Sequence, residues 1–82
     1  MNYLIDTNVI SEPQQKTPLL KVIQWLETHE SQLYTSTIVI AELGYGIEDL
    51  SNGPKRSRLE MWLSQTIRLM HGRILAVNTR VA

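Results

Sequence analysis

The 82-residue sequence predicts a single α/β domain in which a parallel sheet of about three strands is flanked by helices. Three observations lead to this prediction. Short apolar runs rich in strand formers alternate along the chain with longer segments of helical periodicity. Stretches rich in Pro, Gly, Ser and Asn separate these segments. Neighbouring parallel strands need long crossover connections, so this alternation of strand and helix favours a parallel sheet.

The composition is that of a small globular protein. Hydrophobic residues make up 43% of the chain, which argues against general disorder. Eight acids balance eight bases, so the overall charge does not indicate a nucleic-acid binder, although a local patch stays open. Cysteine is absent, which fits a reducing compartment. The N-terminus lacks a signal-peptide pattern, and no apolar run approaches the roughly 20 residues that cross a bilayer. We therefore expect a cytoplasmic protein without a membrane partner.

The first third of the chain predicts a strand followed by a helix. "NYLID" is short, apolar and rich in strand formers, and it predicts a buried strand over about 2–6. "TNVISEP" predicts a turn and a short helical piece that Pro13 closes. Thr17 before Pro18 is typical of a helix start, with a capping hydroxyl and a proline in the first turn. Apolar residues at helical spacing then predict an amphipathic helix over about 18–29.

A second strand and a second helix follow. "QLYTST" predicts a shorter strand, and "TIVIAELGYGIEDL" predicts a helix from about 37 to 50. The apolar residues of this helix fall on two neighbouring rows, which are Ile38, Ala41 and Tyr45, and Ile40, Leu43 and Ile47. Gly44 and Gly46 weaken a helix by up to about 1 kcal/mol each relative to alanine. We expect them to allow close backbone packing.

The last third of the chain predicts a helix and a third strand. "SNGP" is a clear break, after which Pro54 starts a helix that Gly72 ends. "RILAV" predicts the third strand. Asn78 or Thr79 would then cap another helix.

Two acids from separate segments are candidates for one site. Asp6 ends the first predicted strand, and Glu42 lies in the first turns of the helix after the second, so both approach the carboxyl edge of the sheet. Oxygen-only ligation by two carboxylates suits Mg²⁺ or Mn²⁺. The alternatives are that Asp6 is a turn or cap residue and that Glu42 is simply solvated. The apolar neighbours of Glu42 favour the metal site, because an acid among apolar groups needs a partner.

Three segments, "YLIDTNVISEP", "TSTIVIAELGYGIEDL" and "GRILAV", together resemble the PIN-domain family and, within it, the VapC/FitB-type toxins of toxin–antitoxin pairs. The resemblance implies a parallel α/β fold and a ribonuclease that depends on Mg²⁺ or Mn²⁺. It matches Asp6, with Thr7 and Asn8, to the first metal-binding motif of the family. It matches Glu42 to the second. It also implies an RNA substrate, an antitoxin protein partner and a homo-oligomer.

The chain departs from this family in length. Its members continue beyond the strand that matches "RILAV" and supply further acids there. We therefore expect 1–82 to be the N-terminal portion of a PIN-like domain, with impaired activity because only Asp6 and Glu42 hold the ion. Asn78 stands where relatives commonly carry Asp, and we interpret it as a helix cap. Without the missing part, "NYLID" becomes an exposed apolar edge that favours pairing with another chain.

The remaining polar residues carry weaker predictions. Lys55, Arg56 and Arg58 cluster at a helix N-terminus, where the macrodipole disfavours cations, so they are candidates for contact with RNA or an acidic partner, although a solvated cluster is the simpler interpretation. Ser36 is expected either to support the metal site or to cap the following helix. His29 and His71 are interpreted as helix-end residues.

The sequence thus predicts a divalent-metal-dependent endoribonuclease, the toxin of a toxin–antitoxin pair. The alternative is a catalytically inactive module that binds an antitoxin or dimerises. We expect the helices at 18–29 and 37–50 to form the antitoxin-binding surface.

Overall fold

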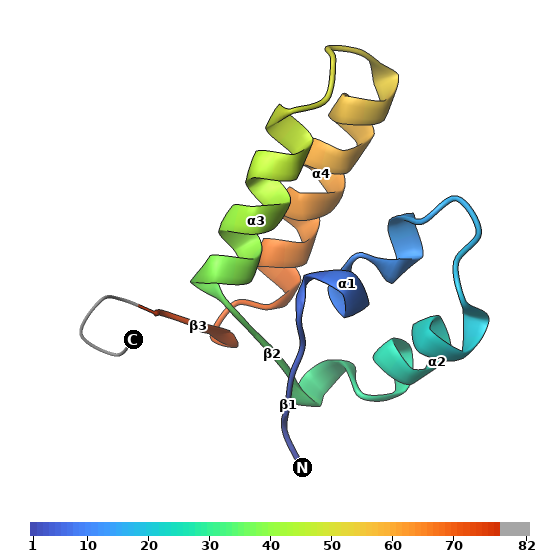
Figure 1. Ribbon diagram of the computed structural model, residues 1–82. Helices are drawn as coiled ribbons and strands as arrows, with labels where there is room; N and C mark the ends of the chain where they lie inside the picture. The colour runs from blue at the N-terminus through green and yellow to red at the C-terminus, as the bar shows by residue number, and fades with distance from the viewer. Residues whose placement is uncertain (78–82) are drawn as a thin grey trace.

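The computed structural model describes residues 1–77, which form a small sheet with helices packed against it (Figure 1). The predicted cap at Asn78 or Thr79 lies outside these residues. The elements in chain order are β1 (Tyr3–Leu4), α1 (Thr7–Ile10), the 3-10 turn η1 (Glu12–Gln14), α2 (Leu20–Thr28), the 3-10 turn η2 (Glu30–Gln32), β2 (Leu33–Ser36), α3 (Thr37–Glu48), α4 (Pro54–Leu69) and β3 (Ile74–Leu75).

The described residues contain three parallel strands in the order β1-β2-β3, so β2 is central and β1 lies at an edge. Tyr3 pairs with Leu33 in one ladder, and Thr35 pairs with Ile74 in the other. The predicted fold class, a parallel sheet of about three strands with flanking helices, is confirmed. The strands are shorter than the predicted segments, because only the residues that pair across the ladders count as strand.

The two faces of the sheet differ in how they are covered. Side chains alternate between the faces of a strand. Tyr3 and Ile5 of the β1 segment therefore share a face with Leu33, and this face carries the core. Leu4 and Leu75 lie on the other face, where they are 68% and 47% exposed. Parallel sheets in most proteins are covered on both faces. In the described residues, helices cover one face of this sheet and leave apolar side chains on the other.

The core is small. Its buried side chains are Ile5, Ile10, Leu33, Leu43 and Met70. They come from the strand β2, from the ends of β1 and α4, and from α1 and α3. About six tenths of the unfolded surface is buried on folding in a chain of this size, so the stability is modest.

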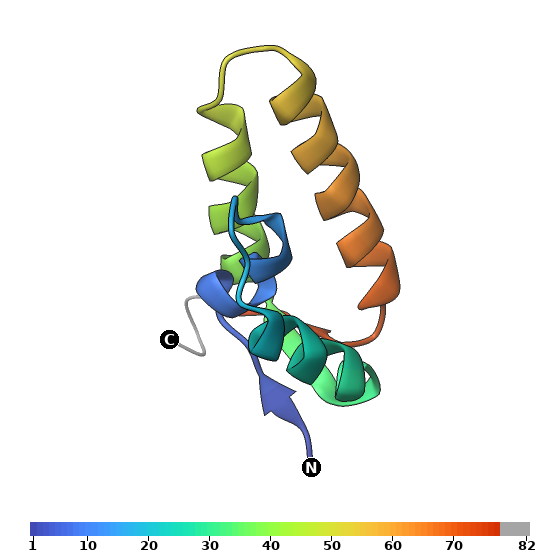
Figure 2. The ribbon, with the colours of Figure 1, turned by 90° about the vertical axis from the view of Figure 1, so that its right-hand side faces the viewer.

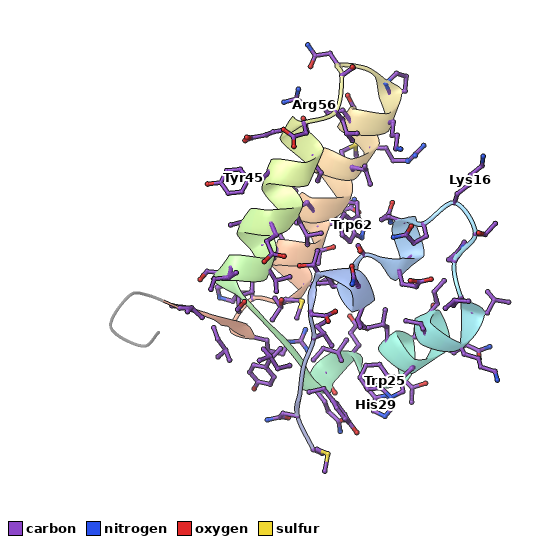
Figure 3. The ribbon with its side chains drawn as sticks, in the orientation of Figure 1. Lys16, Trp25, His29, Tyr45, Arg56 and Trp62 are labelled. Carbon is purple, nitrogen blue, oxygen red and sulfur yellow. The ribbon has the colours of Figure 1, made fainter. Side chains whose placement is uncertain are left out.

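An aromatic cluster fastens α2 to β1. The rings of Tyr3 and Trp25 meet edge to face with centroids 4.9 Å apart, and the His29 ring lies 4.6 Å from that of Trp25. Figure 3 shows Trp25 and His29 side by side at the end of α2. His29 Nδ1 also donates to the Trp25 carbonyl at 2.8 Å, so the predicted role of His29 as a helix-end residue is confirmed.

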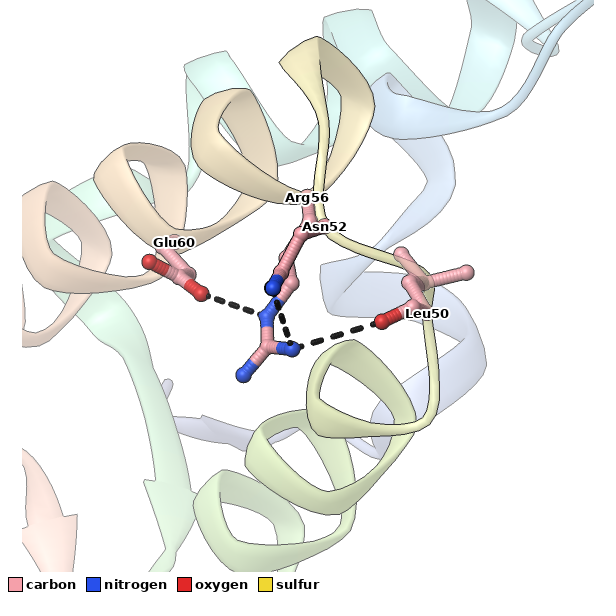
Figure 4. Close-up of polar contacts among 4 residues, drawn as sticks. All are labelled: Leu50, Asn52, Arg56 and Glu60. Carbon is pink, nitrogen blue, oxygen red and sulfur yellow. Dashed lines mark hydrogen bonds and ion pairs between the residues drawn. The ribbon is translucent and has the colours of Figure 1, made fainter.

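The helices α3 and α4 form an antiparallel hairpin that rises from the sheet (Figure 2). Arg56 closes the loop at its far end (Figure 4). Its guanidinium donates to Glu60 Oε1 at 2.8 Å, to Asn52 Oδ1 at 3.0 Å and to the Leu50 carbonyl at 3.4 Å. One side chain thus ties the end of α3 to the first turns of α4.

Two expectations about the helices, the cap at Thr17 and the close packing at the glycines, are wrong. Thr17 does not cap α2, whose N-cap is Leu19; instead Glu12 Oε1 accepts from the Leu19 amide at 2.9 Å. A Cβ at Gly44 or Gly46 would meet nothing within 4 Å, so the described chain packs no backbone against these positions. In the first predicted apolar row, Ile38 and Tyr45 are 51% and 69% exposed. Figure 3 shows Tyr45 pointing away from the hairpin.

Within residues 1–77, no helix combines the length and apolar character that a bilayer span requires.

Candidate metal site

Both strand-to-helix junctions at the carboxyl edge of the sheet are built in the same way. Asp6 follows β1 and is the N-cap of α1, where its Oδ1 accepts from the Val9 amide at 3.0 Å. Ser36 ends β2 and is the N-cap of α3, where its Oγ accepts from the Val39 amide at 3.2 Å. Each cap satisfies an amide that the first helical turn would leave unpaired. Since β1 and β2 are neighbours, the two junctions lie side by side.

A hydrogen bond connects Glu42 to the residue that follows Asp6. The Thr7 hydroxyl donates to Glu42 Oε2 at 2.7 Å, and Thr7 directly follows Asp6. The helices α1 and α3 pack together at this point. The structure therefore brings Asp6 and Glu42, 36 positions apart in the sequence, to the same edge of the sheet.

Each carboxylate uses one oxygen in these contacts. Asp6 accepts through Oδ1, and Glu42 accepts through Oε2. Oδ2 of Asp6 and Oε1 of Glu42 have no hydrogen bond within the described residues. Both side chains are exposed. The expectation that apolar neighbours bury Glu42 is thus wrong, because Glu42 projects from the exposed side of α3 while Leu43 enters the core.

The polar residues predicted to support the site differ in position. Thr7 contacts Glu42 directly, and Ser36 serves as a cap. Asn8 is exposed, and its carbonyl accepts from Ser11 Oγ at 3.4 Å. One contact was not predicted: the Val77 amide donates to Thr37 Oγ1 at 3.1 Å, which joins the segment after β3 to the start of α3. In the sequence, the signal for this contact is limited to a second hydroxyl residue, Thr37, directly after the capping Ser36.

The cationic cluster lies elsewhere. Lys55, Arg56 and Arg58 sit in the first turns of α4, at the end of the hairpin farthest from the sheet (Figures 1 and 3). Lys55 and Arg58 are exposed, whereas the guanidinium of Arg56 is held by the loop contacts described above. The structure does not bring these cations to the carboxylates.

The donor set fits a hard divalent cation held loosely. Mg²⁺ and Mn²⁺ take carboxylate oxygens and retain several waters, so two exposed carboxylates with a free oxygen each meet this requirement. Among residues 1–77, no group of three or more His, Cys, Asp and Glu side chains is placed to hold a metal ion. The described residues therefore offer two protein ligands at this edge.

A model of the PIN domain matches residues 3–82, almost the whole chain. The chain belongs to the PIN-domain family. Asp6 and Glu42, which the resemblance had matched to the two metal-binding motifs of the PIN-domain family, are the two acids that the fold brings together.

The chain is also similar to a toxin and to a ribonuclease. The chain is 43% identical over 81 residues to toxin FitB of Neisseria gonorrhoeae, a match that covers 96% of this chain and 58% of FitB. It is 32% identical to the VapC ribonuclease Y4jK of Sinorhizobium fredii over 88% of this chain and 53% of that protein. A solved structure of FitAB bound to an IR36 DNA fragment superposes with a TM-score of 0.83 at 39% identity, covering 94% of this chain and 55% of that one. The chain thus spans a little over half the length of these relatives.

Proposed function

We propose that this chain carries the two-carboxylate part of a divalent-metal-dependent endoribonuclease site, of the kind used by the toxin of a toxin–antitoxin pair. Asp6 and Glu42 are the metal ligands, and Mg²⁺ or Mn²⁺ is the cofactor. The observation that carries this proposal is the hydrogen bond from Thr7 to Glu42, which holds Glu42 beside the start of the helix that Asp6 caps. Membership of the PIN-domain family and the names of the relatives, a toxin and a VapC ribonuclease, support it.

The residues around the acids have separate roles in this proposal. Asp6 is held by its capping bond through Oδ1, which leaves Oδ2 for the cation. Thr7 holds one oxygen of Glu42 and leaves the other for the cation. A hydrogen bond to a ligating carboxylate orients it and tunes its affinity. An ion held by Asp6 and Glu42 would supply charge neutralisation at a phosphodiester and a more acidic bound water.

We expect weak nuclease activity, because the cation has two protein ligands. With only Asp6 and Glu42, water fills most positions around the cation, and its affinity falls with the number of charged ligands. A site that holds two metal ions needs more carboxylates than residues 1–77 bring to this edge. We therefore propose an impaired nuclease that needs high concentrations of Mn²⁺ for measurable cleavage.

The test is cleavage of a structured RNA in the presence of Mn²⁺. Asp6→Asn is the matched variant, because Asn caps a helix as well as Asp does and so removes the charge without removing the cap. We expect slow cleavage by the wild-type chain that both Asp6→Asn and a chelator abolish. Cleavage that continues unchanged in Asp6→Asn would show that the activity has another origin.

A second function is favoured by the exposed face of α3. Ile38 and Tyr45 are largely exposed there, one on either side of Ala41 along a helical row. Apolar side chains gathered on one helix face often mark a protein interface. The chain would then act as an antitoxin-binding module without catalysis, with this face of α3 as the binding surface. The helix α2, which the sequence also suggested for this surface, lies on the other side of the molecule (Figure 1). Tight binding of a cognate antitoxin that Tyr45→Lys abolishes, together with no RNA cleavage, would favour this function.

A further inference from the structure

The loop between α3 and α4 contains an asparagine followed by a glycine, Asn52 and Gly53. Asparagine is among the chemically labile residues of proteins. The carbon of its side-chain amide can be attacked by the backbone nitrogen of the next residue, and glycine hinders this attack least because it has no Cβ. Both residues are exposed, and a Cβ added at Gly53 would meet nothing within 4 Å. Solvent therefore reaches both reacting groups.

The backbone nitrogen of Gly53, which would make the attack, is not engaged by the fold. Gly53 is the N-cap of α4, and within residues 1–77 its amide donates no hydrogen bond. Its carbonyl accepts from the Ser57 amide at 3.1 Å, so the residue is held through its carbonyl alone. The nitrogen can thus give up its proton to water without the loss of a contact in the described chain.

The side-chain amide of Asn52, the group under attack, is polarised by a neighbouring cation. Arg56 Nη1 donates to Asn52 Oδ1 at 3.0 Å (Figure 4). Glu60 Oε1 at 2.8 Å and the Leu50 carbonyl at 3.4 Å hold the same guanidinium, so the donor is in place before any reaction begins. A fixed cationic donor stabilises the negative charge that a carbonyl oxygen gains when a nucleophile adds to its carbon.

We propose that Asn52 is a site of spontaneous deamidation and that Arg56 promotes the reaction. The Gly53 nitrogen gives its proton to water and forms a bond to Cγ of Asn52, while the bond from Cγ to Nδ2 breaks. Ammonia leaves with a proton taken from water, and a succinimide ring remains. Water then opens the ring at either of its carbonyl carbons, which gives aspartate or isoaspartate at position 52. The reaction consumes one water, releases one ammonia and needs no cofactor.

The reaction changes the charge and the length of the loop. A carboxylate replaces an amide beside the Arg56 guanidinium, in a region where Lys55 and Arg58 are exposed cations. In isoaspartate the main chain also runs through an additional methylene, so the connection from α3 to α4 becomes longer. Both changes occur at the end of the hairpin farthest from the sheet (Figure 1). The proposal therefore does not depend on the proposed nuclease site.

Peptide mapping of the full chain, stored folded at neutral pH, tests this proposal. Trypsin releases Asn52 in the fragment 22–55, which holds no other asparagine, and Asn8 in the fragment 1–16. Asn8 is the internal control, because the branched side chain of Val9 hinders attack and the Val9 amide is already hydrogen-bonded. Tandem mass spectrometry assigns any gain in mass to a residue, and chromatography separates the aspartate and isoaspartate products.

Two variants test the role of the guanidinium. Arg56→Ala removes the donor, and Arg58→Ala is the matched control, because it removes an exposed cation from the same helical turns. In native buffer we expect Arg56→Ala to deamidate at position 52 about tenfold more slowly than the wild type, and Arg58→Ala to match the wild type. In urea all three chains should react at one rate, below that of the folded wild type, because the loop contacts are lost.

No gain in mass at position 52 in the folded wild-type chain would overturn the proposal. So would a rate for Arg56→Ala that equals or exceeds that of the wild type, since the guanidinium would then be without effect or protective. If Arg56→Ala does not fold, the wild-type chain alone decides the matter. Deamidation that is no faster in native buffer than in urea would contradict promotion by Arg56, and faster deamidation in native buffer would support it.

Discussion

The Thr7 hydroxyl and the Glu42 carboxylate are joined by a 2.7 Å hydrogen bond across 35 positions of the sequence. Asp6 precedes Thr7 and caps the same helix, so a single short segment positions one acid and holds the other. The Thr7–Glu42 bond is therefore the structural basis for treating two exposed carboxylates as one site. It also predicts how the site responds when the hydroxyl is removed.

Thr7→Val removes the hydroxyl but keeps the shape of the side chain. We expect the Mn²⁺ affinity to fall by roughly tenfold, because a ligating carboxylate that loses its hydrogen-bond partner is no longer oriented. Isothermal titration calorimetry measures this change. Thr7→Ser keeps a hydroxyl and should retain most of the affinity. Equal affinities for Thr7→Val and wild type would mean that the bond does not position Glu42 for a metal.

Substitution by alanine should have opposite effects on stability at Gly44 and at Gly72. Gly44→Ala should stabilise the fold by up to about 1 kcal/mol, because an added methyl meets nothing and alanine favours helix. Gly72→Ala should destabilise it by about 1 kcal/mol, because Gly72 has a φ of +83°. Urea unfolding of the two variants gives both values. Destabilisation by Gly44→Ala would mean that a partner packs against this face.

Arg56→Ala opens the loop between α3 and α4. We expect a loss of about 1 kcal/mol, mostly from its bonds to Asn52 and the Leu50 carbonyl. The ion pair with Glu60 contributes little, since the side chains are 29% and 54% exposed. Lys55→Ala, one position away and exposed, is the control and should leave the unfolding midpoint unchanged. A similar loss in both variants would mean that the loop contacts of Arg56 are not its cause.

Lys55 and Arg58 offer two free charges at the far end of the hairpin. If RNA binds there, replacing both with alanine should lower the slope of log K against log salt by about 1.4, since single strands release about 0.7 counterions per contact. Fluorescence anisotropy with a labelled RNA at several salt concentrations measures the slope. An unchanged slope would restrict RNA binding to other surfaces.

The strand and helix order could be predicted because each element carries its own local signal. The Pro54 start of α4 and the Gly72 turn after it depend only on backbone chemistry, and both are where the sequence places them. The approach of Asp6 and Glu42 followed from the rule that parallel strands end at one edge. That rule needs no knowledge of side-chain contacts.

Features that depend on tertiary contacts could not be predicted in this way. Thr17 has the chemistry of a cap, but the Leu19 amide is bonded by the Glu12 carboxylate from the preceding 3-10 turn. The helix α2 begins at Leu20, after the predicted start. Glu42 has apolar neighbours in sequence, yet it faces solvent, since a helix turns successive residues to different sides. Asp6 fits both original interpretations, because a cap needs one carboxylate oxygen and a metal can use the other.

The most direct test of the two-acid site is Mn²⁺ binding followed by electron paramagnetic resonance, which needs no RNA and no turnover. The wild-type chain should bind one Mn²⁺, and Asp6→Asn and Glu42→Gln should each lose that binding while their unfolding midpoints stay close to that of the wild type. If all three proteins bind Mn²⁺ equally, or if none of them binds it, Asp6 and Glu42 do not form a metal site.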